Sequence, residues 1–361
     1  MTPLAPGGRL GILGGGQLGR MLSLAAAELG LACHIYCPDK DNVAGEVAAR
    51  TTLAPYDDDT ALIDFAGSVD VVTYEFENVP APTARTLSAH ATVRPGPNAL
   101  ATAQDRLTEK TFLRGIDIAT APFAAIGSAA ELEAALSHLG TPAILKTRRL
   151  GYDGKGQVKI DDPAHATAAL KAIGHKPALL EGFVPFEREI SLVIARGQDG
   201  QIAAYDAVEN IHRHHILAET HVPARIAPQI ADEAQRIAGR IVTALDYVGV
   251  MGVEMFLLPE TAAGPRLLVN EIAPRVHNSG HWTLDACLIS QFEQHVRAVC
   301  GWPLGNPARH ADALMLNLIG ADVDDWARHA AEPNTALHLY GKSETRPGRK
   351  MGHVTKLLPK S

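Results

Sequence analysis

Two apolar stretches of the sequence each carry side chains that could bind a metal ion. Glu254 interrupts GVEMFLL (252–258), and Asn270 and Glu271 interrupt RLLVNEI (266–272). A carboxylate within an apolar strand is disfavoured unless it is paired or ligates a cation. Two carboxylates and an amide on neighbouring strands suit Mg²⁺, which proteins usually hold through one or two carboxylates plus nucleotide phosphates. The alternative is that each acid lies on an edge strand and faces water.

The segment KTRRLGYDGKGQ (146–157) combines three glycines with four cationic side chains. Strand-like runs at 143–147 and 156–160 flank it, which predicts a hairpin with a glycine-rich tip. Backbone N–H groups of such a tip can surround polyphosphate oxygens, and Lys146 would add a positive charge. It is not a Walker A loop, because Gln157 follows Gly156 where that motif has Lys. The alternative is a mobile surface turn with solvated cations.

Two later segments combine polar side chains with loop-forming residues. APRVHNSGHWT (273–283) has neither helical nor strand periodicity, which indicates a loop at a site. LYGKSETRPGRKMGH (339–353) concentrates cations in an acidic chain, which indicates either a second anion pocket or a solvated basic tail. The side chains in question are Arg275, His277 and Asn278 in the first segment, and Lys342, Arg346, Arg349 and Lys350 in the second.

The N-terminus carries the glycine spacing of a dinucleotide-binding turn. Gly14, Gly16 and Gly19 follow an apolar run and open a helical stretch, and Asp39 lies about twenty residues further on. The N-terminus of such a helix can accept a phosphate. Many βαβ folds use the same turn for packing or for another phosphate, so this motif alone does not establish nicotinamide binding.

Cysteine and histidine spacings do not predict a zinc site. Cys33, Cys37, Cys287 and Cys300 contain no C-x2-C pair, and four cysteines in so long a chain do not resemble a disulfide framework. We expect them to be reduced and mostly buried. NIHRHHILAETH (210–221) has four histidines, but it has no cysteine and no HExxH spacing.

The elements that must position these groups fall into three units. Residues 1–103 alternate strand and helix signals, which predicts a parallel sheet, and the prolines of RPGPNAL (94–100) mark its end. Residues 104–186 contain the glycine-rich hairpin, and 187–361 contain the two acid-bearing strands and the basic segment. Within the third unit, a single helix is predicted over 284–301, with Leu288, Phe292, Val296 and Val299 on one face.

Composition indicates an ordinary soluble globular protein. The 361 residues are 46% apolar and 20% charged, and the formal net charge is −7. That charge argues against general nucleic-acid binding. No apolar run is long enough for a membrane span, and the N-terminus lacks a signal-peptide pattern. We therefore expect a cytoplasmic protein without nucleic-acid or membrane partners.

Taken together, the motifs resemble those of a known family. GILGGGQLGRML, YEFENVP, QDRLTEK, LKTRRLGYDGKGQ, EGFVPFEREISLVIAR, NEIAPRVHNSGHWT and YGKSETRPGRKMGH are similar to the ATP-grasp ligases, and within them to the N5-carboxyaminoimidazole ribonucleotide synthetases. The resemblance runs from about Leu10 to His353. It implies an α/β and α+β architecture: a Rossmann-like N-terminal domain, a two-lobed ATP-grasp nucleotide site and a small C-terminal subdomain.

The resemblance also implies an activity, in which 5-aminoimidazole ribonucleotide, bicarbonate and ATP yield the N5-carbamate, ADP and phosphate during purine biosynthesis. The expected cofactor is ATP with Mg²⁺, or Mn²⁺ in its place, and the expected assembly is a homodimer joined through the first domain. Nucleotide contacts then fall on Arg106, Lys146, Gly151, Tyr152, Asp153, Gly154, Lys155, Gly156, Gln157, Glu181, Gly182, Phe183, Val184, Glu189, His212, Asn270 and Glu271. Glu254 and Glu271 are the implied metal ligands, with Asn270 beside them.

The acceptor side of the implied site has two parts. The ribonucleotide pocket corresponds to Gln17, Glu75, Asn78, Tyr152, Lys342 and Arg349, together with Asp153. The bicarbonate position corresponds to Arg275, His277 and Asn278. The catalytic set is therefore Asp153, Arg275, His277, Asn278, Lys342 and Arg349, with Asp153 as a candidate to orient or deprotonate the amine. His214 and His215 have no counterpart in the family pattern.

Three other functions fit parts of the sequence. Another ATP-grasp ligase, such as a formate-using transformylase or a biotin carboxylase, would share the nucleotide site but differ around 275–283 and 342–350. A nicotinamide-dependent oxidoreductase would explain only the N-terminal glycines. A non-catalytic nucleotide sensor would bind Mg-ATP without turnover, and the complete set of charged residues argues against it.

Overall fold

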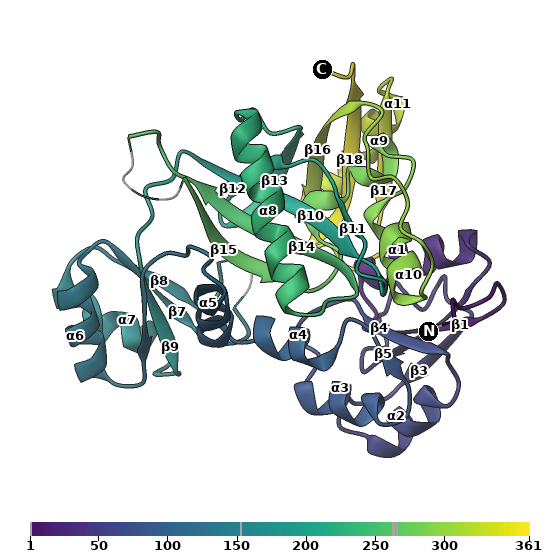
Figure 1. Ribbon diagram of the computed structural model, residues 1–361, viewed down its shortest axis with the longest axis horizontal. Coiled ribbons are helices and arrows are strands. Elements are labelled where there is room, and N and C mark those ends of the chain that lie inside the picture. Colours follow the sequence, from purple (N-terminus) through teal and green to yellow (C-terminus); the bar gives the residue numbers. More distant parts are fainter. Residues whose placement is uncertain (1, 152–153, 262–263, 265) are drawn as a thin grey trace.

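The computed structural model describes residues 2–151, 154–261, 264 and 266–361, which form three β-sheets (Figure 1). The N-terminal sheet is parallel throughout, with strand order β3-β2-β1-β4-β5. This confirms the predicted βαβ arrangement. The sequence analysis did not identify β3 and β5, which are short. The elements of the N-terminal sheet and its helices are β1 (Arg9–Leu13), α1 (Gln17–Glu28), β2 (Ala32–Cys37), β3 (Arg50–Leu53), α2 (Asp59–Ala66), β4 (Val71–Tyr74), α3 (Ala81–Ser88) and β5 (Thr92–Val93).

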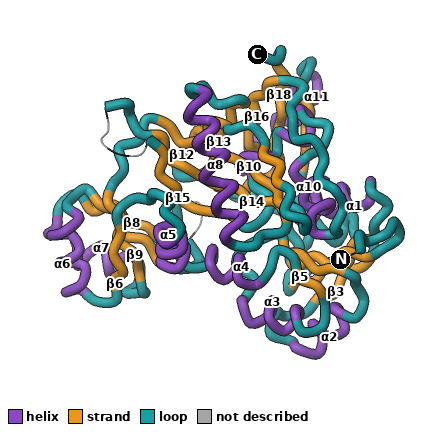
Figure 2. Tube along the Cα trace, viewed as in Figure 1, coloured by secondary structure: helices purple, strands orange, loops and turns teal. Residues whose placement is uncertain are grey.

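The second sheet carries the predicted glycine-rich hairpin. Its order is β6-β9-β7-β8, and β7 pairs antiparallel with β8 up to Lys146 opposite Gln157. Figure 2 shows helices α6 and α7 on its outer side, where Leu145 and Leu180 pack against them. Lys146, on the alternate face, is therefore directed away from this core. The elements are α4 (Pro97–Ala103), α5 (Arg106–Gly115), β6 (Phe123–Ile126), α6 (Ala129–Leu139), β7 (Ala143–Thr147), β8 (Gln157–Ile160), α7 (Ala166–Ala172) and β9 (Ala178–Gly182).

The third sheet has nine strands in the order β15-β14-β10-β12-β13-β16-β18-β17, with β11 paired to β10. Because β16 pairs with β13, the C-terminal strands continue this sheet. Helix α8 lies across the sheet in Figure 1 and packs Ala234, Ala238 and Ile241 into its core. The elements are β10 (Arg188–Arg196), β11 (Ile202–Ala204), β12 (Val208–Arg213), β13 (Ile216–Val222), α8 (Pro228–Ala244), β14 (Gly249–Leu257), β15 (Leu267–Ala273), α9 (Thr283–Ala286), α10 (Gln291–Val299), β16 (Asp312–Ile319), α11 (Trp326–Ala331), β17 (Thr335–Leu339) and β18 (Lys350–Leu358).

The prediction of one helix over 284–301 is wrong. Cys287 is extended, with φ −126° and ψ 152°, so the chain leaves the helical path after α9. Ser290 then caps α10, and its hydroxyl accepts the N–H of Glu293 at 3.2 Å. Leu288, which was expected on the buried face, is 83% exposed. Phe292, Val296 and Val299 are buried as expected, because they belong to α10 itself.

Two further observations concern the cysteines and the helices. All four cysteines are buried and carry free thiols. Within the described residues, no helix has the length and apolar character to cross a membrane.

Candidate active site

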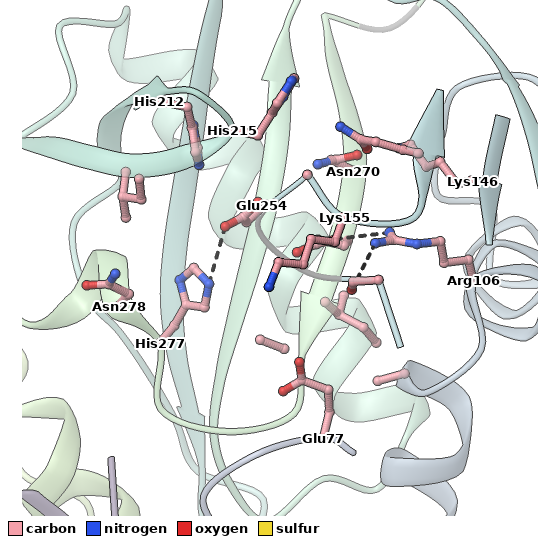
Figure 3. Close-up of a pocket in the computed structure, with 18 of the residues that line it drawn as sticks. Glu77, Arg106, Lys146, Lys155, His212, His215, Glu254, Asn270, His277 and Asn278 are labelled. Atoms are coloured by element: carbon pink, nitrogen blue, oxygen red, sulfur yellow. Dashed lines mark hydrogen bonds and ion pairs between the residues drawn. The ribbon is translucent and has the colours of Figure 1, made fainter. Parts of the chain in front are cut away.

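The three sheets meet around a cavity of about 910 Å³. Its walls come from the loops after β1 and β4, from strands β7 and β9, and from the ends of β12, β14 and β15. Figure 3 shows charged side chains from these separate elements pointing into the same space. The cavity therefore collects residues that are far apart in the sequence.

The two acids predicted as metal ligands are direct cross-strand neighbours. Glu254 on β14 pairs in register with Glu271 on β15, and a bulge follows Glu254. Two carboxylates in opposed positions repel each other, so this pair is unfavourable without a cation or another partner. Next to them, Oδ1 of Asn270 is buried and has no hydrogen-bond partner. This donor set of two carboxylates and an unpartnered amide oxygen fits Mg²⁺.

The carboxylate of Glu254 is held by a histidine that is itself fixed in place. Nε2 of His277 lies 3.2 Å from Oε1 of Glu254 (Figure 3). Burial alone would raise the pKa of Glu254, but the hydrogen bond and charge of His277 hold it below its usual value. The side chain of Gln291 accepts from the His277 N–H at 2.8 Å and donates to its carbonyl at 2.7 Å. Gln291 thus clamps the backbone of the predicted loop.

A network of buried charges joins the two lobes beside the predicted nucleotide site. Glu181 lies between Lys146, whose Nζ is 2.7 Å from Oε2, and Lys110, whose Nζ is 3.4 Å from Oε1. Burial would raise the pKa of Glu181, but the two ammonium groups lower it to about 2. Lys110 also donates to the carbonyl of Asn270 at 2.8 Å, and its side chain is 1% exposed. This lysine therefore connects β9 of one sheet with β15 of another.

Helix α5 makes further contacts with strand β15. Arg106, its first residue, places Nη1 3.2 Å from Oε2 of Glu271. Glu109 accepts the N–H of Ile272 at 2.6 Å, and burial together with the charge of Glu271 raises its pKa to about 8. The helix begins where Asp105 caps it, accepting from the N–H groups of the first turn. Helix α5 thus positions the guanidinium group of Arg106 and also the strand that carries Glu271.

The N-terminal glycine turn is occupied by a side chain of the protein itself. Glu75 accepts the N–H of Gly16 and, at 2.5 Å, the N–H of Gly19. Gly14 has φ +114°, and a Cβ there would lie 2.4 Å from Cγ of Glu75. The donors that would bind a dinucleotide phosphate in the fingerprint are therefore already used. This arrangement argues against the nicotinamide alternative and places Glu75 at the edge of the cavity.

Arg275 is held by a residue that the sequence analysis did not single out. Its Nε donates to the carboxylate of Glu77, which lies two residues beyond Glu75 in YEFENVP. Both side chains line the cavity. The nearby Asn278 has its side-chain oxygen and nitrogen buried without partners. Two unsatisfied polar atoms in a cavity wall indicate a ligand position.

Most predicted nucleotide contacts line the cavity. Glu189 and His212 both line the cavity, and Oε2 of Glu189 lies 2.8 Å from Nδ1 of His212, so the two side chains lie at the same part of the wall. Gly156 does not line the cavity, and a Cβ built on it would lie 2.6 Å from Oγ1 of Thr147. Tyr152 and Asp153 lie outside the described residues. The predicted residues that line the cavity are Gln17, Glu75, Asn78, Arg106, Lys146, Gly151, Gly154, Lys155, Gln157, Glu181, Gly182, Phe183, Val184, Glu189, His212, Glu254, Asn270, Glu271, Arg275, His277 and Asn278.

The basic C-terminal segment contributes differently from the expectation. Lys350 lines the cavity, whereas Lys342 and Arg349 do not. Lys342 donates to the carbonyl of Lys350 at 2.6 Å, and Arg349 donates to the carbonyl of Glu344 at 2.7 Å. Lys342 is still close enough for its charge to act on the carboxyl group of Glu75. The segment therefore borders the cavity on the side of the N-terminal domain.

Several residues of this site were missed by the sequence analysis. Glu77, Lys110, His281 and Gln291 were not singled out, and His215, which has no counterpart in the family pattern, lines the cavity. Glu77 and Lys110 stand within the quoted motifs YEFENVP and QDRLTEK, so their position was a signal. The partners of Gln291 lie on a loop before its helix, and no local pattern indicates them.

The four histidines of 210–221 do not converge. His212 pairs with Glu189, and Nε2 of His221 lies 3.3 Å from Glu219. His214 and His215 form the turn between β12 and β13. Among the described residues, none of these four histidines belongs to a cluster of side chains that could hold a metal ion.

Comparisons with known proteins define the class first. Residues 111–292 match the ATP-grasp domain, residues 8–104 the ribonucleotide synthetase preATP-grasp domain, and residues 313–361 the phosphoribosylaminoimidazole carboxylase C-terminal domain. The fold is thus that of an ATP-grasp ligase.

Full-length relatives narrow this class. The chain is 52% identical to the N5-carboxyaminoimidazole ribonucleotide synthase of Brucella melitensis biotype 1, covering 100% of this chain and 99% of the relative. A solved ADP complex of an N5-carboxyaminoimidazole ribonucleotide synthetase superposes with a TM-score of 0.94 at 39% identity, covering 99% and 94% of the two chains. The Aspergillus clavatus enzyme, solved with ADP and 5-aminoimidazole ribonucleotide, gives a TM-score of 0.90 at 31% identity over 98% and 95%. The chain belongs to the N5-carboxyaminoimidazole ribonucleotide synthase family.

Proposed function

We propose that this protein is an ATP- and Mg²⁺-dependent ligase that carboxylates 5-aminoimidazole ribonucleotide with bicarbonate, giving the N5-carbamate, ADP and phosphate in purine biosynthesis. The observation that carries this proposal is the cavity between the three sheets. It joins the cross-strand pair Glu254 and Glu271, the lysine–glutamate network of the nucleotide side, and the unsatisfied Asn278. A family relative is solved with ADP and the aminoimidazole ribonucleotide.

The reaction explains why the described lining of the cavity is rich in charged side chains. Bicarbonate is a poor electrophile, and transfer of the γ-phosphoryl group of ATP would convert it to carboxyphosphate, from which phosphate can leave. Phosphoryl transfer requires mainly positioning and charge neutralisation from the protein. The substrate amine then attacks the activated carbon and displaces phosphate, or it attacks CO₂ after phosphate has left, and in either case the nitrogen loses a proton.

Each group of residues has a role in this scheme. Lys146 and Arg106 would neutralise nucleotide phosphates, and Glu189 with His212 would hold the ribose. Glu254, Glu271 and Asn270 would hold Mg²⁺, or Mn²⁺ in its place, which when bound offsets the negative charge of the phosphates.

On the acceptor side, Arg275, His277 and Asn278 line one part of the cavity and would bind bicarbonate and its activated form. Gln17, Glu75 and Asn78, with Lys342 and Arg349 at the border, would bind the ribonucleotide. Roles for Tyr152 and Asp153 rest on the family resemblance.

The experiment that tests this proposal is phosphate release from Mg-ATP with bicarbonate, with and without 5-aminoimidazole ribonucleotide. Release that depends on the ribonucleotide supports the synthase reaction. Binding of Mg-ATP without stimulation by the ribonucleotide would keep the nucleotide site but exclude this acceptor. Formate in place of bicarbonate distinguishes a transformylase, and binding without any turnover distinguishes a nucleotide sensor.

We further propose that the enzyme is a cytoplasmic homodimer joined through its first domain, with the divisions 1–103, 104–186 and 187–361. Family resemblance supports the dimer, and the three sheets support the divisions. Size-exclusion chromatography with light scattering tests the oligomeric state directly.

A further inference from the structure

The turn between β12 and β13 places two histidines in a conformation that side-chain-bearing residues rarely adopt. Arg213 pairs with Ile216, so His214 and His215 make up the whole loop. Their φ angles are 52° and 64°. Positive φ at both central positions is characteristic of a type I′ hairpin turn, for which Asn-Gly is the favoured sequence. Unfavourable backbone conformations that persist tend to occur at functional sites, which motivates a search for a role.

This turn borders the nucleotide side of the cavity. Both histidines line it, and both side chains are exposed. His215 packs against the glycine-rich loop: a Cβ built on Gly154 would lie 2.5 Å from Cβ of His215. Gly154 itself has φ +77°, so the contact joins two left-handed turns. Figure 3 shows the His215 side chain in the same region as Asn270 and Lys146.

We propose that His215, which packs against Gly154 and lines the cavity, is a ligand for the nucleotide polyphosphate. This inference rests on the proposed ATP site. A neutral imidazole has one N–H donor and a protonated imidazole has two, so His215 can donate to a phosphate oxygen in either state. Lys146 and Lys155 line the same cavity and would add positive charge for an anion. Asn-Gly would form the turn with less strain, but it would place no imidazole at this position.

The chain provides a matched control for the backbone effect. His175 also has a positive φ, 52°, after helix α7, and it is exposed outside the cavity lining. Replacing either residue by glycine relieves the same kind of strain. Only a change at His215 should affect nucleotide binding.

The test compares H214N/H215G, H215N and H175G with the unaltered chain, using thermal unfolding and the Kd values of Mg-ADP and AMP. We expect H214N/H215G to unfold at the same temperature or a few degrees higher. Its Kd for Mg-ADP should rise about tenfold, the effect of one charge-assisted hydrogen bond. Its Kd for AMP should change less than about twofold, because the contact is to the polyphosphate. H175G should leave both Kd values unchanged.

The outcomes separate this inference from the proposed function. Absence of Mg-ADP binding by the unaltered chain would remove the nucleotide site and the inference together. Normal Mg-ADP binding by a folded H214N/H215G variant would overturn the inference alone, as would an equal loss for AMP and ADP. If the double variant does not fold, H215N decides, since asparagine tolerates positive φ and has a shorter side chain. A Kd for Mg-ADP raised several-fold supports the proposal, and an unchanged Kd overturns it.

Discussion

The N–H of Gly19 donates to Oε2 of Glu75 at 2.5 Å, so a carboxylate of the protein takes the place that a phosphate has in dinucleotide-binding turns. Glu75 comes from the end of β4 and Gly19 from the first turn of α1, which are neighbours through the pairing of β1 with β4. Burial raises the pKa of Glu75, whereas the two N–H donors lower it. The first domain has the sequence signature of a cofactor site but uses it internally.

Removing this carboxylate should destabilise the first domain. Glu75→Ala leaves the buried N–H of Gly19 and the partly buried N–H of Gly16 without this acceptor, and we expect a loss of about 2 kcal/mol in the free energy of unfolding. Glu75→Gln keeps one acceptor oxygen and should lose about half as much. Urea denaturation of both variants measures the difference. Equal stability of the alanine variant and the unaltered chain would contradict the structural role.

Lys110 should be essential for stability although it lies at the lobe junction. Lys110→Met removes the donor to Asn270 and one of the two cations on Glu181, and we expect a loss of about 3 kcal/mol. Adding Glu181→Gln should recover part of this loss, since the uncompensated carboxylate is then absent. A double-mutant cycle by chemical denaturation measures the coupling between the two residues. Strict additivity would show that they act independently.

Lys146 should matter for ATP use more than for folding. Lys146→Ala is expected to lower kcat/KM for ATP by about a hundredfold, the effect of losing one charge-stabilising group. Lys146→Arg keeps the charge beside Glu181 and should lose much less. Steady-state phosphate release at varied ATP, with the unfolding temperature as a check, separates the two effects. Unchanged turnover in the alanine variant would exclude the assigned role.

The carboxylate pair should govern the metal requirement. Chelation with EDTA is expected to abolish turnover, and Mn²⁺ should restore it. Glu254→Gln and Glu271→Gln each remove one charged ligand, so the Mg²⁺ concentration for half-maximal rate should rise at least about tenfold. Glu293→Gln, on α10 outside the cavity lining, 17% exposed and paired with Arg297, is the matched control. An identical Mg²⁺ dependence in all three variants would place the metal elsewhere.

His295 should make stability depend on pH. Its Nδ1 accepts the N–H of Val250 at 3.0 Å and its Nε2 lies 2.8 Å from the hydroxyl of Thr73, an arrangement that requires a neutral ring. Burial lowers its pKa to about 3. Below the unfolded value of about 6.5 the unfolded chain therefore binds a proton that the folded chain does not, and stability falls with pH until about pH 3.

The glutamine variant isolates this effect from the other buried histidines. Between pH 7 and pH 5 the unaltered chain should lose about 2 kcal/mol more than His295→Gln, whose amide can accept from Val250 and donate to Thr73 without titrating. Urea denaturation at the two pH values measures the difference. Parallel losses would show that His295 takes up its proton in the folded state.

The sequence by itself determined the local elements and the types of chemistry. The β7–β8 hairpin, the acids at 254 and 271 and the parallel first sheet follow from periodicity and from charges placed in apolar strands, which act within a few residues. Local pattern failed at Leu288, because its spacing continues a helix that the extended Cys287 interrupts. Local sequence patterns also do not predict which distant residues contact each other in the fold.

Only the tertiary structure determined which charged side chain contacts which partner. Lys110 reaches β15, Glu77 holds Arg275, and Glu75 fills the glycine turn, although each pair is separated by 56 to 198 residues along the chain. A hydrogen bond depends on distance and direction in space, and neither can be read from separation in sequence. The same reason applies to His215, whose place at the cavity follows from the packing of its turn against Gly154.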